Sequence, residues 1–272
     1  MTSCPVVLSV TSLPSRIGKI RPCLESLLSG TRRPDKIIVS LPFHSAREKT
    51  EYQVPDFLND RHFCADVVEL VRVENDWGPG TKLLGGLPLV SENSCMVLVD
   101  DDVIYSPNFL QHIADAQLNE RQASFSYFTY TVGGIVIGQG CDGFSFWRPN
   151  LTGISEFFQK YVSGTDLVLH DDFWISIFLA SKHVRVKTLN HLVRINDAIY
   201  LKSYDDESSL RYLTGSQSRD ILQKEHLGRL LKEVEMSSFL RMKLRFGVQA
   251  EFLFADPSRK ICKKISNFLS GR

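Results

Sequence analysis

Three consecutive aspartates, Asp100, Asp101 and Asp102, directly follow an apolar segment at residues 95–99 (CMVLV). A continuous apolar run of this kind is typical of a strand buried on both faces of a sheet, and open α/β sheets bind ligands outside the carboxyl ends of such strands. Three adjacent carboxylates repel one another, so their joint ionisation requires a nearby cation. Oxygen ligands suit Mg²⁺ or Mn²⁺, which can in turn hold a diphosphate. The alternative is a solvated acidic loop or a helix cap, but the abrupt change from apolar to acidic favours a metal site.

A glycine-rich turn, residues 76–82 (DWGPGTK), joins an earlier apolar run to a segment with helical spacing. Gly78 and Gly80 allow the backbone to approach a ligand closely, and the amino end of a helix presents unpaired N–H groups to an anion. Lys82 adds a positive charge. The spacing is not that of a P-loop. The segment either binds an anion or is only a turn, and its position one strand before the aspartates favours binding.

Residues 11–16 (TSLPSR) follow the first apolar run of the chain. Hydroxyl groups and an arginine at the carboxyl end of a strand suit a ribose, a base or a phosphate. Alternatively, Ser15 caps the next helix and Arg16 is solvated. The residues themselves leave both interpretations open.

A second acidic group, Asp171 and Asp172, follows His170 at the start of a segment with helical spacing. The helix dipole favours acidic residues at this position without any function. A general base must, however, be a carboxylate or an imidazole on a firm mount, and the start of a helix beside a sheet provides one. The sequence alone does not decide between these interpretations.

The elements that must position these residues are predicted from apolar spacing. Short apolar runs predict strands, helical spacing predicts helices, and their alternation predicts βαβ units with a parallel sheet. The region 124–148 is rich in glycine and aromatic residues and predicts strands that cross the first sheet at an angle. We therefore expect one continuous α/β domain with a helical tail beyond residue 205, with strands at 5–10, 35–41, 67–73, 95–99 and 184–189 and helices at 17–29, 81–90, 107–119 and 171–182.

The composition excludes several classes of protein. With 43% hydrophobic and 23% charged residues, the chain of 272 residues is not a disordered protein. Its net charge of +1 argues against a nucleic-acid binder. No apolar run is long enough for a membrane span, and the N-terminus does not resemble a secretory signal. The six cysteines contain no C-x-x-C pair, which favours free thiols in a cytoplasmic protein.

In this order, the motifs resemble those of the GT-A glycosyltransferases, especially family-two-like bacterial and viral members. The resemblance covers about residues 5–200 and rests on V-x-S-x-T-S-x-P-S-R-I, D-W-G-P-G-T-K, V-L-V-D-D-D-V-I-Y and D-D-F-W-I-S. It implies an α/β GT-A domain at 1–204 around a mostly parallel central sheet. Within that domain, residues 1–106 would form the half that binds the nucleotide sugar and 107–204 the acceptor half. A basic helical region, 205–272, would pack on the domain.

On the donor side, the resemblance implies a D-x-D motif with Asp102 as the direct Mn²⁺ or Mg²⁺ ligand. Asp100 would face the ribose or a water on the metal, and Asp101 would occupy the variable place beside the nucleotide sugar. Family members often add a C-terminal histidine, for which His191 and His226 are unassigned candidates. The positions that match those holding the nucleotide, base and diphosphate are Thr11, Ser12, Arg16, Asp76 and Lys82.

On the acceptor side, the later acidic pair matches the catalytic base of inverting members. Asp172 is preferred to Asp171, because the base usually precedes the apolar stretch immediately. Asp142, in a glycine-rich segment, is a second choice. Aromatic residues either form a platform for sugar rings or pack in the core; these are Phe144, Phe146, Trp147 and Trp174.

The implied function is metal-dependent transfer of a sugar, with UDP-sugars favoured, to a hydroxyl of a glycan or lipid-linked acceptor. A nucleotidyltransferase acting on sugar phosphates is the second enzyme hypothesis, although its first loop would be rich in glycine and basic residues. The third hypothesis is an inactive protein that binds nucleotides or carbohydrates.

The C-terminal segment is basic, since residues 221–272 hold 11 basic and 5 acidic side chains while the rest of the chain is acidic. Residues 239–272 alternate basic with apolar side chains, as in segments that lie on anionic membranes. This pattern predicts either peripheral contact with the inner face of a membrane or a helix that closes the domain.

Overall fold

The computed structural model describes residues 4–64, 66–192, 200–203, 225–226 and 229–230. The chain divides into two compact units, Met1–Tyr130 with Val136–Gly215, and Thr131–Ile135 with Ser216–Arg272. All the candidate site residues except His226 belong to the first unit. The predicted helical region 205–272 falls outside the described residues apart from 225–226 and 229–230, so it stays a prediction.

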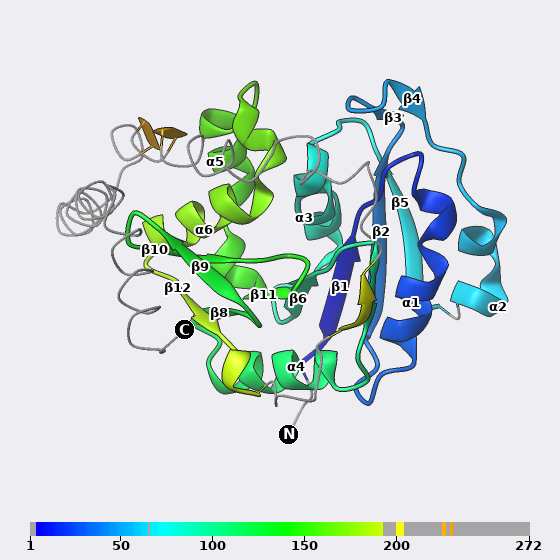
Figure 1. Cartoon of the computed structure of the whole chain (residues 1–272), viewed down its shortest axis with the longest axis horizontal. Coiled ribbons are helices and arrows are strands. Elements are labelled where there is room, and N and C mark those ends of the chain that lie inside the picture. Colours follow the sequence, from blue (N-terminus) through cyan, green and yellow to red (C-terminus); the bar gives the residue numbers. More distant parts are fainter. Residues whose placement is uncertain (1–3, 65, 193–199, 204–224, 227–228, 231–272) are drawn as a thin grey trace, which may run out of the picture. The chain divides into compact units, whose positions relative to one another are not determined.

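A seven-stranded sheet forms the centre of the first unit, in the order β12-β8-β11-β6-β1-β2-β5 (Figure 1). Six strands run in one direction and only β11 is reversed, because β11 pairs antiparallel with both β6 and β8 whereas the other pairs are parallel. The mostly parallel α/β sheet predicted from the sequence is therefore confirmed. The strands are β1 (Val6–Val10), β2 (Lys36–Pro42), β5 (Val68–Val73), β6 (Cys95–Leu98), β8 (Ala123–Ser126), β11 (Phe144–Trp147) and β12 (Arg185–Thr188).

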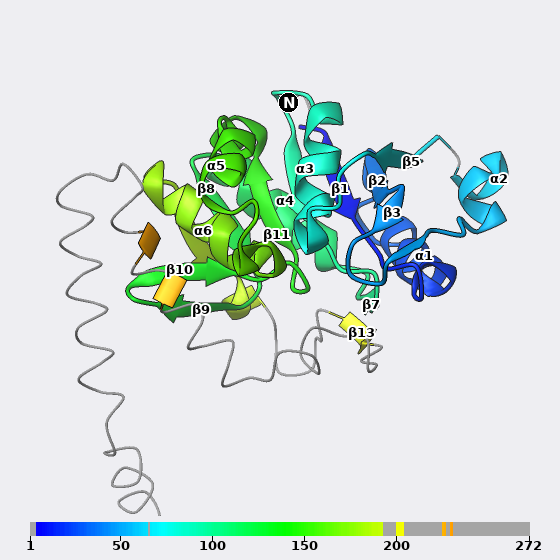
Figure 2. The ribbon, with the colours of Figure 1, turned by 90° about the horizontal axis from the view of Figure 1, so that it is seen from above.

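Helices cover both faces of this sheet (Figure 2). The alternating side chains of β1 explain the arrangement, since Leu8 belongs to a core cluster with Leu24 of α1 and Phe109 of α4. Ser9 faces the other way and contacts α3. The longer helices are α1 (Arg21–Leu28), α3 (Thr81–Gly86), α4 (Phe109–Asn119), α5 (Ile154–Tyr161) and α6 (Asp171–Ser181).

Small residues bring α3 close to the sheet. A Cβ atom on Gly85 would lie 3.0 Å from Ser40 of β2, and one on Gly86 would lie 2.5 Å from the hydroxyl of Ser9 in β1. The Ser9 hydroxyl donates a hydrogen bond to the carbonyl oxygen of Lys82. These contacts fix the first turn of α3, and with it Lys82, against the centre of the sheet.

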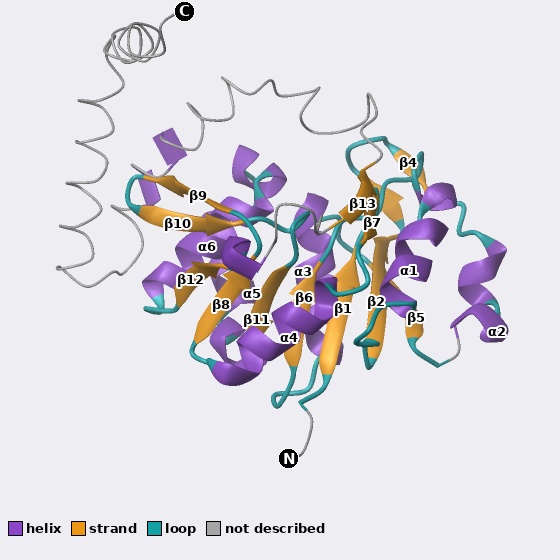
Figure 3. Cartoon of the chain, turned by 60° about the horizontal axis from the view of Figure 1, so that its bottom comes forward, coloured by secondary structure: helices purple, strands orange, loops and turns teal. Residues whose placement is uncertain are grey.

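The region 124–148 differs from its prediction. β8 and β11 do not cross the sheet at an angle but belong to it, and only the hairpin of β9 (Thr129–Val132) and β10 (Ile135–Gly138) is separate (Figure 3). Continuous burial of Phe144, Ser145 and Phe146 suits a central strand covered on both faces.

Several short elements have no counterpart in the predictions. These include the β3 (His44–Ser45) and β4 (Thr50–Glu51) hairpin, α2 (Arg61–Cys64), and β7 (Val103–Tyr105), which pairs with β13 (Tyr200–Ser203). Two predicted helices are each divided: η1 (Ile17–Lys19) precedes α1, and η4 (Leu87–Leu89) follows α3. Among the described residues, none of the helices has both the length and the apolar character required to cross a membrane.

The strand directions determine where the candidate residues gather. Because β1, β2, β5 and β6 are parallel, the loops that follow them leave one edge of the sheet, the carboxyl edge. β11 begins at this edge, since Phe144 pairs with Leu98 at the end of β6.

Candidate active site

The loops after β1 and β6 meet through the aspartate triplet. The hydroxyl of Ser12 donates to Asp101, and the Arg16 guanidinium also pairs with Asp101. Arg16 Nη2 lies 3.1 Å from Asp102 Oδ2. Asp101 is buried. The Asp101 carboxylate therefore connects the loop after β1 with the loop after β6. Four residues that the sequence singled out lie together at this point: Ser12, Arg16, Asp101 and Asp102.

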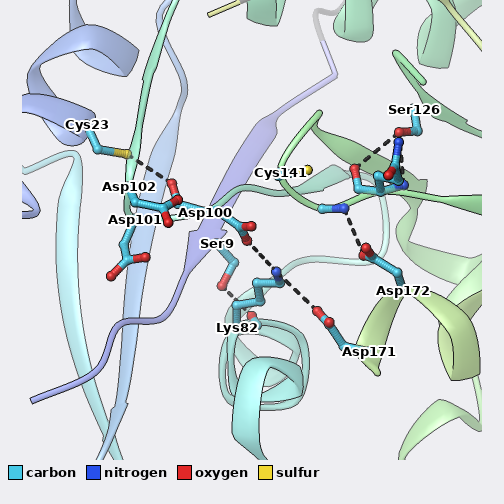
Figure 4. Close-up of polar contacts among 12 residues, drawn as sticks. Ser9, Cys23, Lys82, Asp100, Asp101, Asp102, Ser126, Cys141, Asp171 and Asp172 are labelled. Carbon is cyan, nitrogen blue, oxygen red and sulfur yellow. Dashed lines mark hydrogen bonds and ion pairs between the residues drawn. The ribbon is translucent and has the colours of Figure 1, made fainter. Parts of the chain in front are cut away.

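Lys82 lies between Asp100, which follows β6, and Asp171, at the start of α6. Its ammonium is 2.7 Å from Asp100 Oδ1 and 3.1 Å from Asp171 Oδ2 (Figure 4). Burial alone would lower the pKa of Lys82, but the carboxylates of Asp100, Asp171 and Asp172 raise it well above its ordinary value. Lys82 therefore remains a cation and holds the Asp100 loop to the start of α6.

Asp172 is partly buried in the first turn of α6. Its Oδ1 accepts a hydrogen bond from the backbone N–H of Gly140 at 2.8 Å. Burial and the neighbouring Asp171 raise the pKa of Asp172 to about 8, although Lys82 and the Gly140 N–H oppose the shift. A carboxylate with such a pKa is a stronger base than an ordinary aspartate.

Asp142 is a third acidic group on this side of the sheet. It is buried, and its Oδ2 accepts a hydrogen bond from the Gln139 side chain at 2.8 Å. Burial and the charge of Asp100 raise the pKa of Asp142 to about 7. Tyr105 connects Asp100 with the segment that carries Asp142. Its hydroxyl accepts a hydrogen bond from the backbone N–H of Asp100 and donates one to the carbonyl of Cys141.

Two further candidate residues, Asp76 and Thr11, form hydrogen bonds with backbone groups of neighbouring segments. Asp76 accepts the N–H groups of Ala46 at 2.7 Å and of Gly78 at 2.8 Å, and Thr11 donates to the carbonyl of Ser40 at 2.8 Å. Asp76 thus connects the β3–β4 hairpin to the glycine-rich turn.

Sequence reasoning missed two further residues that hold these loops. The buried hydroxyl of Tyr52 donates to the Ser12 carbonyl at 2.8 Å, and Glu48 accepts from the backbone N–H of Ser15 at 2.9 Å and from its hydroxyl. The hairpin that carries Glu48 is too short for apolar periodicity to reveal. Residues 44–51 (HSAREKTE) also contain no Gly, Pro, Asn or Asp to indicate a turn.

Of the two interpretations of the aromatic residues, packing in the core applies to three of the four. Phe144, Phe146 and Trp174 are completely buried, so their faces pack in the core and cannot stack on a ligand. Trp147 pairs with Cys95 at the amino end of β6, away from the aspartates, and its ring lies 4.3 Å from the Arg121 guanidinium.

The histidine candidates for a further metal ligand stay unassigned. His191 is exposed in η7 (Asn190–Leu192), and His226 belongs to the second unit. Within the described part of the chain, no three His, Cys, Asp or Glu side chains are arranged to hold a metal ion.

The charges at the carboxyl edge nevertheless suit a divalent cation. Burial and the charge of Asp100 raise the pKa of Asp102, although Arg16 opposes the shift. A cation beside Asp100 and Asp102 would relieve this repulsion, and carboxylate oxygens are the ligands that Mg²⁺ and Mn²⁺ prefer.

Comparison with known proteins identifies the fold. No protein-family model and no curated protein matches the sequence. Among solved structures, the mannosyltransferase PcManGT from Pyrobaculum calidifontis, in complex with GDP-Man and Mn²⁺, matches with a TM-score of 0.58 at 13% identity, over 97% of this chain and 79% of that one. TarS 1–349 from S. aureus, in complex with UDP-GlcNAc, matches with a TM-score of 0.57 at 13% identity, over 94% and 74% of the two chains. The chain therefore has the GT-A glycosyltransferase fold that its motifs predict.

Proposed function

We propose that this protein is a glycosyltransferase that moves a sugar from a nucleotide sugar to a hydroxyl group of a glycan or lipid-linked acceptor. One observation supports this proposal most directly. Lys82 forms ion pairs with Asp100 and with Asp171 at the start of α6, at the carboxyl edge of a GT-A sheet. The two similar structures contain GDP-Man and UDP-GlcNAc, which supports a nucleotide-sugar donor.

We assign the donor to the half formed by residues 1–106. In the described part of the chain, Arg16 and Lys82 form ion pairs with the triplet, so they are the residues that would balance the charge of a diphosphate there. Asp100 and Asp102 would hold a divalent cation, Mn²⁺ or Mg²⁺, and such an ion supplies further positive charge to the leaving diphosphate.

We assign the general base to Asp172, within the acceptor half at 107–204. Its raised pKa suits removal of a proton from the acceptor hydroxyl as that oxygen attacks the anomeric carbon, with inversion of configuration. The charge of Asp171 is already paired with Lys82, so Asp171 is a structural partner in this scheme. Asp142 is the second candidate for the base.

The test measures transfer and hydrolysis of UDP- and GDP-sugars with Mn²⁺, with Mg²⁺ and with EDTA. We expect metal-dependent release of the nucleoside diphosphate, which increases when a suitable acceptor is added. Asp172→Asn should lose transfer by a factor of about 10²–10⁴ while it still binds the nucleoside diphosphate. The matched control is Asp115→Asn, at an exposed position on α4. Release of pyrophosphate from a nucleoside triphosphate and a sugar phosphate, without sugar transfer, would instead indicate a nucleotidyltransferase.

A further inference from the structure

The two adjacent carboxylates of α6 have different partners, and a segment far away in the sequence causes the difference. Asp171 pairs with Lys82, whereas Asp172 Oδ1 accepts the backbone N–H of Gly140. Residues 139–143 lie between β10 and β11 and are named the Gly140 loop here. Because one N–H of this loop holds one carboxylate oxygen, the loop sets the direction of the Asp172 side chain (Figure 4).

We propose that the Gly140 loop is a positioning element for Asp172, and that Ser126 and Ser176 hold the loop in place. The inference rests on the proposed role of Asp172 as the general base. It adds residues on β8 and α6 that touch neither donor nor acceptor in that scheme and act through Asp172.

Ser126 connects the loop to the central sheet. It is completely buried at the end of β8, and its hydroxyl accepts the backbone N–H of Gln139 at 3.1 Å. The single hydroxyl proton is shared between the carbonyl oxygens of Phe128 at 2.9 Å and Gln139 at 3.1 Å. The residue that precedes Gly140 is therefore tied to a rigid strand. A buried hydroxyl that binds backbone groups in this way restricts their movement more than a solvated one.

Ser176 connects Gly138, the residue of β10 that directly precedes the loop, to the helix that carries Asp172. Its hydroxyl accepts the N–H of Gly138 at 3.2 Å and donates to the carbonyl of Asp172 at 2.7 Å. Gly138 and Gly140 therefore attach at two points to the first turns of α6. This double attachment fixes the distance between the Gly140 N–H and the Asp172 carboxylate.

Position 140 requires a residue without a side chain. A Cβ atom there would lie 2.8 Å from Lys82 Nζ and 3.3 Å from Asp172 Oδ1. The Lys82 ammonium is buried between two carboxylates, so moving it away would disturb its ion pairs. Glycine allows the loop to close over Lys82 and to reach Asp172.

The consequence for catalysis is geometric. With Oδ1 held by Gly140, Oδ2 is the oxygen that would take the proton from the acceptor. A misplacement of about 1 Å in such a group can cost about 10² in rate without weakening ground-state binding. Loss of the anchors should therefore lower kcat and leave donor affinity unchanged.

The experiment compares two buried serines on the same strand. Ser124 and Ser126 both lie on β8 and are completely buried, but the Ser124 hydroxyl has no hydrogen-bond partner in the described part of the chain. We expect Ser126→Ala to lower kcat by about tenfold or more while Kd for UDP and GDP with Mn²⁺ changes by less than about twofold. Ser124→Ala should leave both quantities within about twofold of the wild type. Equal kcat values for the two variants in an active enzyme would overturn the inference.

A second measurement keeps the inference testable without turnover. Amide hydrogen exchange of the Gly140 loop should become at least about tenfold faster in Ser126→Ala than in Ser124→Ala, because the loop loses its anchor. Unchanged exchange would contradict the positioning role even if no donor sugar is ever found. Absence of transfer by the wild type from every nucleotide sugar would contradict the proposed function instead.

Gly140→Ala provides an independent variant in case Ser126→Ala does not fold. We expect a loss of kcat at least as large, because the added methyl at Gly140 also crowds Lys82. Gly18→Ala is the matched control, because an added methyl at Gly18 meets no atom within 4 Å. Wild-type kcat in a folded Gly140→Ala protein would also overturn the inference.

Discussion

Replacement of Asp172 by asparagine should stabilise the protein and inactivate it at the same time. The folded chain raises the pKa of Asp172 from 3.8 to about 8, mainly through burial and then through the charge of Asp171. The unfolded chain releases this proton near pH 4, whereas the folded chain keeps it until about pH 8. Between these values the folded state binds more protons, so the contribution of Asp172 to stability falls as the pH rises.

The size of this effect on stability follows from the shift in the pKa of Asp172. Each pKa unit corresponds to about 1.36 kcal/mol, so ionisation of Asp172 would cost the folded state at most about 4 kcal/mol at pH 7. The two carboxylates share this repulsion, and an asparagine must still accept the Gly140 N–H through its amide oxygen. We therefore expect Asp172→Asn to raise the free energy of unfolding by about 1–3 kcal/mol at pH 7. This corresponds to an increase of about 2–10 °C in Tm for a domain of this size.

The assay is thermal or urea unfolding of wild type and Asp172→Asn from pH 4 to pH 8. The difference in unfolding free energy should be close to zero at pH 4 and should increase steadily to pH 8. Asp171→Asn is the matched control, because it removes a partner of the buried Lys82 and should destabilise the protein by about 1–3 kcal/mol. A difference for Asp172→Asn that is negative, or that does not increase with pH, would refute the reasoning.

Four further outcomes are expected. Lys82→Met removes the buried cation that pairs with Asp100 and Asp171, and it should lower the free energy of unfolding by about 3–5 kcal/mol in urea titrations, so a loss below about 1 kcal/mol would contradict the ion pairs of Lys82. Asp102→Asn should abolish Mn²⁺-dependent binding of a nucleoside diphosphate in calorimetry, and unchanged affinity would remove Asp102 from the metal site. The kcat/KM of transfer should rise tenfold per pH unit below about pH 8 and then level off, because the free enzyme must lose the Asp172 proton; a profile flat from pH 6 to 8 would exclude this base. If residues 239–272 contact a membrane, the full-length chain should sediment with anionic liposomes at low salt more than a chain ending at residue 238 does, whereas equal sedimentation would exclude this contact and favour a helix that closes the domain.

The sheet could be predicted because its strands are determined by local composition. The run Cys95–Val99 is apolar throughout and must be buried on both faces, so both its strand and its central place follow from the sequence. The β3–β4 hairpin is different, since two-residue strands have no period and exist here through contacts such as Asp76 with Ala46. The aromatic residues could not be assigned from the sequence for a related reason: Trp174 has the same ring whether it faces a sugar or the core, and only tertiary packing decides between these fates.

The candidate site, too, could be predicted from the sequence only in part. The spacing of Asp171 and Asp172 could predict an acidic helix start, but not that the two residues have different surroundings. That difference comes from Lys82, about 90 residues earlier in the chain, and from the N–H of Gly140, about 30 residues earlier. Neither contact leaves a local pattern, because one depends on the close approach of α3 to the sheet and the other on a loop anchored by Ser126 and Ser176. A motif therefore identifies which residue types gather at the carboxyl edge, whereas the choice of the base depends on the electrostatic environment that distant segments build around each carboxylate.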